Sequence, residues 1–122
     1  MTLLHTVVEM PEFRSRAGRW MSDFERLSLI NYLAANPQAG DKMAGTGSAR
    51  KVRWAVGHAG KSGVVRAITL YSGQEMPVFL LTVFGKGEKS NITQAEANAL
   101  KSVLGDIVEE YKKKSENKGA KR

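Results

Sequence analysis

The 122-residue sequence predicts an α+β domain, a small and mainly antiparallel β-sheet flanked by helices, in the order β-α-α-β-β-β-α. Two observations predict this class. Between residues 50 and 84, short β-branched runs alternate with glycine-rich turns, as is typical of strands joined by hairpins. On either side of this region, apolar residues recur at spacings of three and four, which is typical of helices. A chain of this length can bury one adequate hydrophobic core.

The first part of the chain predicts one strand followed by two helices. Residues 3–8 form an apolar and β-branched run, which indicates a strand. Pro11 is well placed to open a short helix, with Gly18 as a possible break. Ser22 is a typical N-cap for a second helix, which should end before Pro37. The stripe expected to be buried along this second helix comprises Trp20, Phe24, Leu27, Ile30 and Ala34.

Three strands are predicted in the middle of the chain. They are expected at residues 50–54, 64–71 and 78–84, after a loop at 40–47, with a turn at 57–63 between the first two. In the first strand, alternation places Lys51 and Arg53 on one face. In the second strand, Arg66 shares a face with the apolar residues at 64, 68 and 70. The third strand is apolar on both faces, which predicts a central strand that is covered on both sides.

The last element is predicted to be a helix that begins at a capping box, Thr93–Glu96. Past Tyr111 its apolar stripe stops and lysines follow, so we expect fraying into a solvated tail. This predicts a single domain at residues 1–111 and a basic C-terminal tail at residues 112–122. The stripe expected to pack on the sheet comprises Leu100, Val103, Leu104, Ile107, Val108 and Tyr111.

Positive charge is concentrated in two segments of the chain. The 19 lysines and arginines against 12 acidic residues give a net charge of +7. Residues 42–74 contain basic side chains and no acid, and residues 112–122 contain a single acid, Glu116. Such an uneven distribution favours a polyanion as the binding partner.

Several classes of protein are disfavoured by composition. The sequence has no cysteine, which excludes a disulfide scaffold, a thiolate zinc site and a cysteine nucleophile. The two histidines are far apart and the basic middle offers no carboxylates, so we expect no metal site. We find no apolar run long enough for a spanning helix and no signal-peptide pattern, and expect a cytoplasmic protein without membrane contacts.

Residues 55–62 match the loose pattern of a phosphate-binding loop and end in Gly-Lys-Ser. Such a loop must be followed by a helix whose N-terminus faces the phosphates. Here a β-branched run begins at Val64 instead, so we interpret the segment as a hairpin turn. His58 in this turn is either an exposed histidine without a role or a proton donor or acceptor near a bound phosphate.

Basic residues on adjacent strands form the strongest candidate site. If the hairpin places Arg66 on the same side as Lys51 and Arg53, these cations converge, with Lys86 and Lys89 following the last strand. The alternative is an ordinary solvated basic surface. The lack of intervening acids favours an anion-binding patch, because unbalanced cations repel one another. Such a patch could bind an RNA backbone, and it could also stabilise the charge that develops on phosphorus during strand cleavage.

Four segments, in this order, are similar to the RelE/HigB-like toxins of toxin–antitoxin pairs. They are residues 35–41, 45–53, 60–66 and 80–93. The resemblance extends over about residues 3–111 and is closest to the HigB-like subgroup. It implies a RelE-like, microbial RNase-like fold and a ribosome-dependent mRNA endoribonuclease, or mRNA interferase, that inhibits translation from the ribosomal A site.

The chemistry that the resemblance implies needs no metal or cofactor. The 2′-hydroxyl attacks the adjacent phosphorus and leaves a cyclic phosphate and a free 5′-hydroxyl. The family's catalytic positions correspond to Lys51 and Arg53 after the glycine-rich loop, to Arg66, which would hold the scissile phosphate, and to Lys86. Further contacts with RNA or the ribosome are expected from Arg50, His58, Lys61, Phe84, Lys89, Lys112, Lys113 and Lys114.

The proton-transfer residue is not identified by the resemblance. Some relatives have a tyrosine or a histidine–aspartate set near the end of the last strand, where this sequence has Phe84. A phenylalanine can stack on a base but cannot transfer a proton. His58 and Glu88 are therefore the alternatives to a lysine in that role.

The resemblance also implies binding partners and leaves two other functions open. The partners would be mRNA and ribosomal RNA on the ribosome, and a cognate antitoxin, expected to be HigA-like with a helix-turn-helix. The alternatives are a non-catalytic toxin of the gyrase-inhibitor type on the same fold, and a basic RNA-binding module. The RNase requires the phosphate-binding set of Arg66, Lys51 and Arg53, whereas a gyrase inhibitor would act through surfaces elsewhere. A binding module would show salt-sensitive RNA binding without cut ends.

Overall fold

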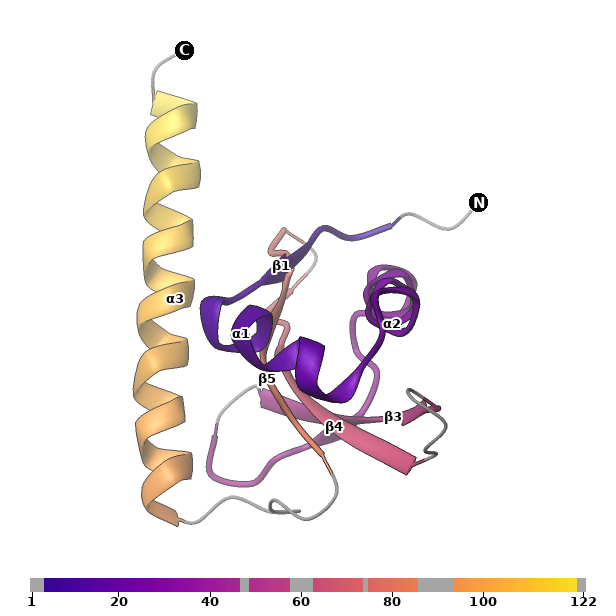
Figure 1. The fold of residues 1–122 in the computed structure, drawn as a ribbon. Coiled ribbons are helices and arrows are strands. Elements are labelled where there is room, and N and C mark those ends of the chain that lie inside the picture. The colour runs from indigo at the N-terminus through magenta and orange to yellow at the C-terminus, as the bar shows by residue number, and fades with distance from the viewer. Residues whose placement is uncertain (1–3, 47–48, 58–62, 74, 86–93, 121–122) are drawn as a thin grey trace.

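A computed structural model describes residues 4–46, 49–57, 63–73, 75–85 and 94–120, with side chains up to residue 114. In this part of the chain the α+β order is confirmed (Figure 1), with one additional short strand in the loop at 40–47. The elements are β1 (Val7–Glu9), α1 (Pro11–Trp20), α2 (Asp23–Ala35), β2 (Asp41–Lys42), β3 (Ala49–Val56), β4 (Gly63–Leu70), β5 (Val78–Phe84) and α3 (Gln94–Ala120).

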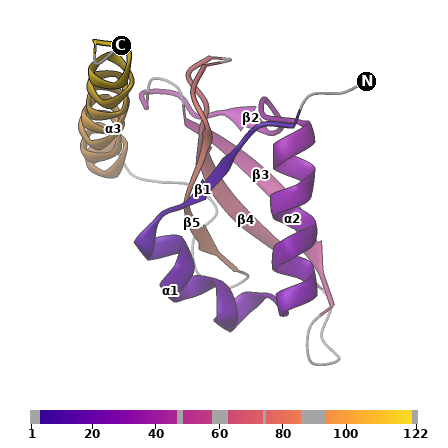
Figure 2. The ribbon, with the colours of Figure 1, turned by 90° about the horizontal axis from the view of Figure 1, so that it is seen from above.

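The strands form one mixed, mostly antiparallel sheet in the order β1-β5-β4-β3-β2. β1 pairs parallel with β5, and the other pairs are antiparallel. Seen from above, α1 and α2 lie on one side of the sheet and α3 lies on the other (Figure 2). β5 lies between β1 and β4 and is buried along nearly its whole length, so the prediction of a central, doubly covered strand is confirmed.

The N-terminus of α2 is fixed by the predicted cap. The Ser22 hydroxyl accepts a hydrogen bond from the Glu25 amide at 3.1 Å, and the Glu25 carboxylate accepts one from the Ser22 amide at 2.9 Å. These two bonds satisfy amides that have no partner within the helix. The helix ends at Ala35, as the following Pro37 predicted. Gly18, by contrast, does not break α1, which continues to Trp20.

The stripe predicted for the buried face of α2 is wrong at two positions, although Trp20 and Ile30 pack against the core as expected. Phe24 and Leu27 are 77% and 56% exposed, whereas Leu29 and Leu33 are buried in the core. The prediction took its phase from Trp20, but Trp20 belongs to α1, and the chain changes direction before α2 begins. The contact of α2 with the core is therefore centred on Leu29 and Leu33.

The first strand is shorter than the predicted range of residues 3–8: β1 comprises only Val7–Glu9. The residues before it are held by other contacts. The His5 amide donates to the Ala34 carbonyl at 2.8 Å, and the His5 ring lies edge-on to Tyr71, with its Nε2 3.2 Å from the Tyr71 hydroxyl. These contacts give His5 a structural role, although it lies outside β1.

Arg26 connects the three N-terminal elements. Its Nε donates to the Glu9 carboxylate at 2.6 Å, and its guanidinium lies 5.7 Å from the centre of the Phe13 ring. Both partners are on elements other than α2, namely β1 and α1. This ion pair therefore helps to hold α1, α2 and β1 together on one side of the sheet.

α3 packs on the other side of the sheet through most of its predicted stripe. Leu104 is buried, and its neighbours at 100, 107, 108 and 111 pack beside it, whereas Val103 is 51% exposed. The helix does not fray past Tyr111 but continues to Ala120. Lysine and glutamate are good helix formers, and a Glu109–Lys113 pair at 3.9 Å adds weak support, so this part of the helix can form without burial.

The segment that matched the phosphate-binding-loop pattern connects two strands. Val56 at the end of β3 pairs with Gly63 at the start of β4. A strand therefore follows the Gly-Lys-Ser sequence where a nucleotide-binding loop needs a helix. The interpretation as a β3–β4 hairpin is confirmed. Within the described ranges, none of the helices combines the length and apolar character needed to cross a membrane.

We predict that Leu33→Ala lowers the free energy of unfolding by about 2–5 kcal/mol, since it leaves a cavity in the core. Leu27→Ala on the exposed face of the same helix should change it by less than about 0.5 kcal/mol. Urea denaturation followed by circular dichroism measures both. Equal losses for the two variants would contradict the orientation of α2.

Candidate polyanion-binding face

The register of the sheet brings the predicted cations together. Arg53 on β3 lies directly opposite Arg66 on β4, and Arg66 lies directly opposite Phe84 on β5. Residues opposite one another in an antiparallel pair have side chains on the same face. Lys51, two residues before Arg53, is on this face as well. We call Lys51, Arg53 and Arg66 the cationic face.

The cationic face lies on the side of the sheet that α3 covers only in part. α3 packs against Ala49, Leu70 and Phe79, which lie towards one end of the strands. β3 and β4 extend away from α3 (Figure 1). By their register, Arg53 and Arg66 lie in the half of the two strands that ends at the Val56–Gly63 pair. Arg53 is exposed, and Lys51 and Arg66 are half-buried. An anion can therefore reach the cations beside the end of the sheet that α3 leaves open.

The Arg53–Arg66 pair is electrostatically unfavourable for the protein alone, whereas Lys51 lies opposite Asp41 on β2. Like charges directly opposite one another on neighbouring strands destabilise a sheet. Within the part of the chain that the structure describes, neither Arg53 nor Arg66 forms a salt bridge or a side-chain hydrogen bond. A bound anion would remove this repulsion, which makes the pair a favourable site for a phosphate group.

Phe84 is not available for the base-stacking role expected of it. Its side chain is 4% exposed and belongs to the core cluster under α3. A ring that is buried to this extent has almost no free face on which a base could stack. It lies opposite Arg66, so its ring provides an apolar surface beside the aliphatic part of that arginine, which we call the Phe84 floor.

Arg50 does not join the cationic face. It alternates with Lys51 along β3 and is therefore on the opposite face of the sheet, where its Nη1 donates to the Gly40 carbonyl at 3.1 Å. Gly40 has a φ of +94°, and a Cβ there would meet the Lys51 carbonyl at 2.6 Å, so only glycine allows this close approach to β3. Arg50 therefore helps to hold the loop that contains Gly40 against β3.

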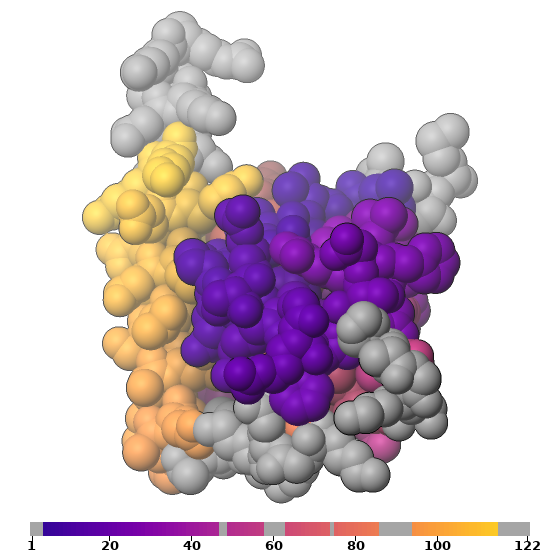
Figure 3. Space-filling view, viewed as in Figure 1, coloured from indigo at the N-terminus to yellow at the C-terminus, as the bar shows by residue number. Residues whose placement is uncertain are grey.

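Lys112, Lys113 and Lys114 are exposed and lie far along α3. About 27 Å of helix axis separates Lys112 from Gln94, at the usual rise per residue. In the space-filling view, α3 forms one flank of the molecule, beside the surface of α1 and α2 (Figure 3). These lysines form a separate basic region. The other predicted contacts, His58, Lys61, Lys86 and Lys89, and the alternative base Glu88, lie outside the described residues.

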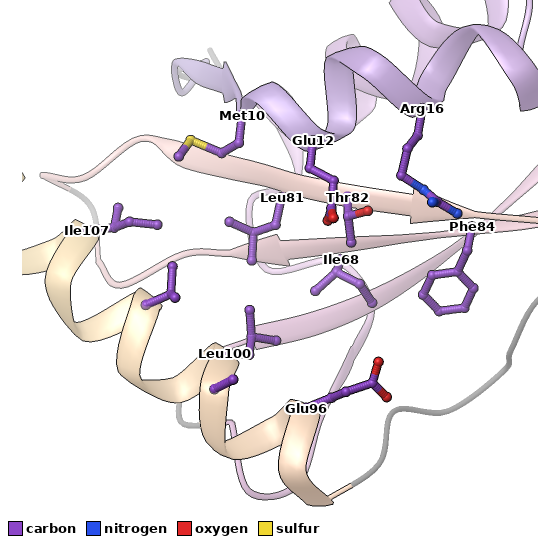
Figure 4. Close-up of a pocket in the computed structure, with 12 residues that line it drawn as sticks. Met10, Glu12, Arg16, Ile68, Leu81, Thr82, Phe84, Glu96, Leu100 and Ile107 are labelled. Carbon is purple, nitrogen blue, oxygen red and sulfur yellow. The ribbon is translucent and has the colours of Figure 1, made fainter.

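A groove of about 730 Å³ lies between α1, β5 and α3 (Figure 4). Arg16 and Glu12 reach into it from α1, and Glu96 reaches into it from α3. The Arg16 Nε donates to the Val83 carbonyl at 2.8 Å. Sequence reasoning missed these residues, because nothing in the local pattern shows that α1 lies along β5. The apolar lining comprises Met10, Ile68, Leu81, Phe84, Ala99, Leu100, Val103 and Ile107.

These features define an α+β domain with a cationic sheet face. A family model described as RelE toxin of RelE / RelB toxin-antitoxin system matches residues 32–120. The match covers most of the chain and includes the whole cationic face. The chain therefore belongs to the RelE family and is a toxin of a toxin–antitoxin system. β1, α1 and most of α2 precede the matched region.

We predict that Arg53→Gln stabilises the protein by about 0.2–1 kcal/mol at low ionic strength, because it removes a repulsive cross-strand pair. The gain should shrink in high salt, which screens exposed charges. Urea denaturation at two salt concentrations measures the effect. Arg14→Gln, which removes an exposed arginine from α1, is the matched control. Loss of stability in Arg53→Gln alone would show that Arg53 has a favourable partner.

Proposed function

We propose that this RelE-family toxin is a ribosome-dependent, metal-independent mRNA endoribonuclease that inhibits translation. The observation that supports this most directly is the Arg53–Arg66 pair, with Lys51 beside it, on a sheet face that α3 covers only in part. A surface with three converging cations can hold a phosphodiester and stabilise the additional negative charge of its transition state. Family membership supports the same activity, since the toxin class is established by the match over residues 32–120.

In the proposed reaction the 2′-hydroxyl of the messenger attacks the adjacent phosphorus. The bond from phosphorus to the 5′-oxygen breaks, which yields a cyclic phosphate and a free 5′-hydroxyl. Arg66 is half-buried between Arg53 and Phe84, so it is the best-supported cation for holding the non-bridging oxygens. Arg53 and Lys51 would stabilise the charge that develops on those oxygens.

Proton transfer in this proposal is assigned to residues near the end of β5 and in the β3–β4 hairpin. The 2′-hydroxyl must lose a proton and the 5′-oxygen must gain one. Phe84 cannot do either. Lys86 remains the first candidate for one of these transfers, with His58 and Glu88 as alternatives.

The proposed partners follow from the same activity. The messenger would be cut in the ribosomal A site, with the lysines at residues 112–114 contacting ribosomal RNA. The matching family is described together with RelB antitoxins, and we propose an antitoxin that covers the cationic face or blocks entry into the ribosome. The HigA-like antitoxin with a helix-turn-helix expected from the sequence is the alternative. A cytoplasmic location fits a ribosomal target.

We predict that Arg66→Ala lowers the rate of messenger cleavage on programmed ribosomes by about 10²–10³-fold, the usual cost of losing one group that stabilises transition-state charge. Arg14→Ala, the same change at an exposed arginine on α1, should cleave as the wild type does. Mapping of 5′ ends in a reconstituted translation system measures both.

Three results would distinguish the functions. Cuts by the wild type that require translating ribosomes support the proposal, and cuts of equal rate by Arg66→Ala would refute the role of Arg66. Growth arrest by the wild type with intact messages would indicate a non-catalytic toxin of the gyrase-inhibitor type. Salt-sensitive RNA binding without cut ends would indicate a binding module.

A further inference from the structure

The end of β5 is held by two residues of α1. The Arg16 Nε donates to the Val83 carbonyl at 2.8 Å. Four residues later on the same helix, the Trp20 ring lies against Gly85, where a Cβ would collide with the ring atoms Cε3, Cζ3 and Cδ2. Residues four apart lie on the same face of a helix. One face of α1 therefore contacts the backbone on both sides of Phe84.

The contact of α1 with β5 lies where the outer edge of β5 has no paired strand in the described residues. β1 pairs with β5 only at Val78–Leu80, so within the described residues no strand lies beside the outer edge of β5 after Leu80. α1 follows that edge instead, as the groove view shows for Glu12 and Arg16 (Figure 4). The Arg16 side chain supplies the hydrogen-bond donor that a neighbouring strand would otherwise supply to the Val83 carbonyl.

The Trp20 ring is placed by packing and not by a hydrogen bond. Its Nε1 is buried and has no acceptor in the part of the chain that the structure describes. Buried donors without a partner are rare and are tolerated where another requirement fixes the side chain. The close contact with Gly85 is that requirement, since any residue larger than glycine would force the ring or the strand end to move.

Residues 83–85, which α1 holds, lie beside the cationic face. Phe84 lies between the two points of contact and directly opposite Arg66. We infer that Arg16 and Trp20 are positioning residues, which fix residues 83–85 and thereby hold the Phe84 floor beside Arg66. The inference rests on the proposed function for its kinetic consequence only. α1 precedes residues 32–120, so the family match does not account for this role.

Gly85→Ala tests the contact, and Gly18→Ala is its matched control. The first adds a methyl group where the Trp20 ring lies, and the second adds the same group on α1 with nothing within 4 Å. We expect Gly85→Ala to lower kcat on programmed ribosomes by about tenfold or more, because small displacements of a catalytic group are costly. The ribosome concentration at half-maximal rate should change less than about twofold, since remote binding contacts are intact. Gly18→Ala should match the wild type.

Trp20→Ala, alone and combined with Gly85→Ala, separates positioning from stability. Removing the ring makes room for the new methyl group, so the double variant should unfold at the same temperature as Trp20→Ala. If α1 positions Arg66, the double variant stays slow although the collision is gone. If the double variant instead recovers both kcat and thermal stability relative to Gly85→Ala, the contact is only structural and the inference is overturned.

A spectroscopic measurement keeps the inference testable without the reaction. The guanidinium Nε–H signal of Arg66 in the nitrogen–proton NMR spectrum, assigned with Arg66→Lys, should shift in Gly85→Ala and Trp20→Ala, and that of Arg14 should not. If the wild type does not cleave but the Arg66 signal shifts, the proposed function fails and the positioning role stands. An unchanged Arg66 signal with unchanged kcat would overturn the positioning role alone.

Discussion

The pairing of β3 with β4 is the constraint on which the rest of the molecule depends. The ladder runs without a shift from Ala49 opposite Leu70 to Val56 opposite Gly63. A slip of one residue would exchange the two faces of one strand. The apolar residues that pack under α1 and α2 would then face α3, and Arg53 would no longer lie opposite Arg66. The two core clusters and the cationic face are therefore fixed by one register.

The core on both sides of this ladder explains why a repulsive pair can persist. Val52 and Val65 are buried in the cluster under α1 and α2, and Ile68 and Leu70 are buried in the cluster under α3. Each buried aliphatic side chain stabilises the fold by about 1.5–3 kcal/mol. A like-charge pair costs about 0.2–1 kcal/mol. The burial of only a few residues is thus enough to hold two arginines side by side.

The sequence pattern predicted the features that depend on interactions between residues close together in the chain. Alternation placed Lys51 and Arg53 on one face, and the Ser22 cap and the stop before Pro37 set the limits of α2. The orientation of α2 and the docking of Arg16 depend on how whole elements pack, for which neighbouring residues carry no signal. The burial of Phe84 was available from the sequence, since a strand covered on both faces leaves no ring free for a base. That expectation and the stacking role were inconsistent with each other.

The strand order has a consequence for how the protein is made. β5 is inserted between β4 and β1, and it pairs in parallel with the strand that emerges first, so that Val7 meets Val78. The β3–β4 hairpin is a local structure and can form early, whereas pairing between distant parts of a chain is slow. During synthesis β1 and α1 have no complete binding surface until β5 has left the ribosome. The nascent chain therefore carries Arg53 and Arg66 before the β5 residues that lie beside Arg66 have been made.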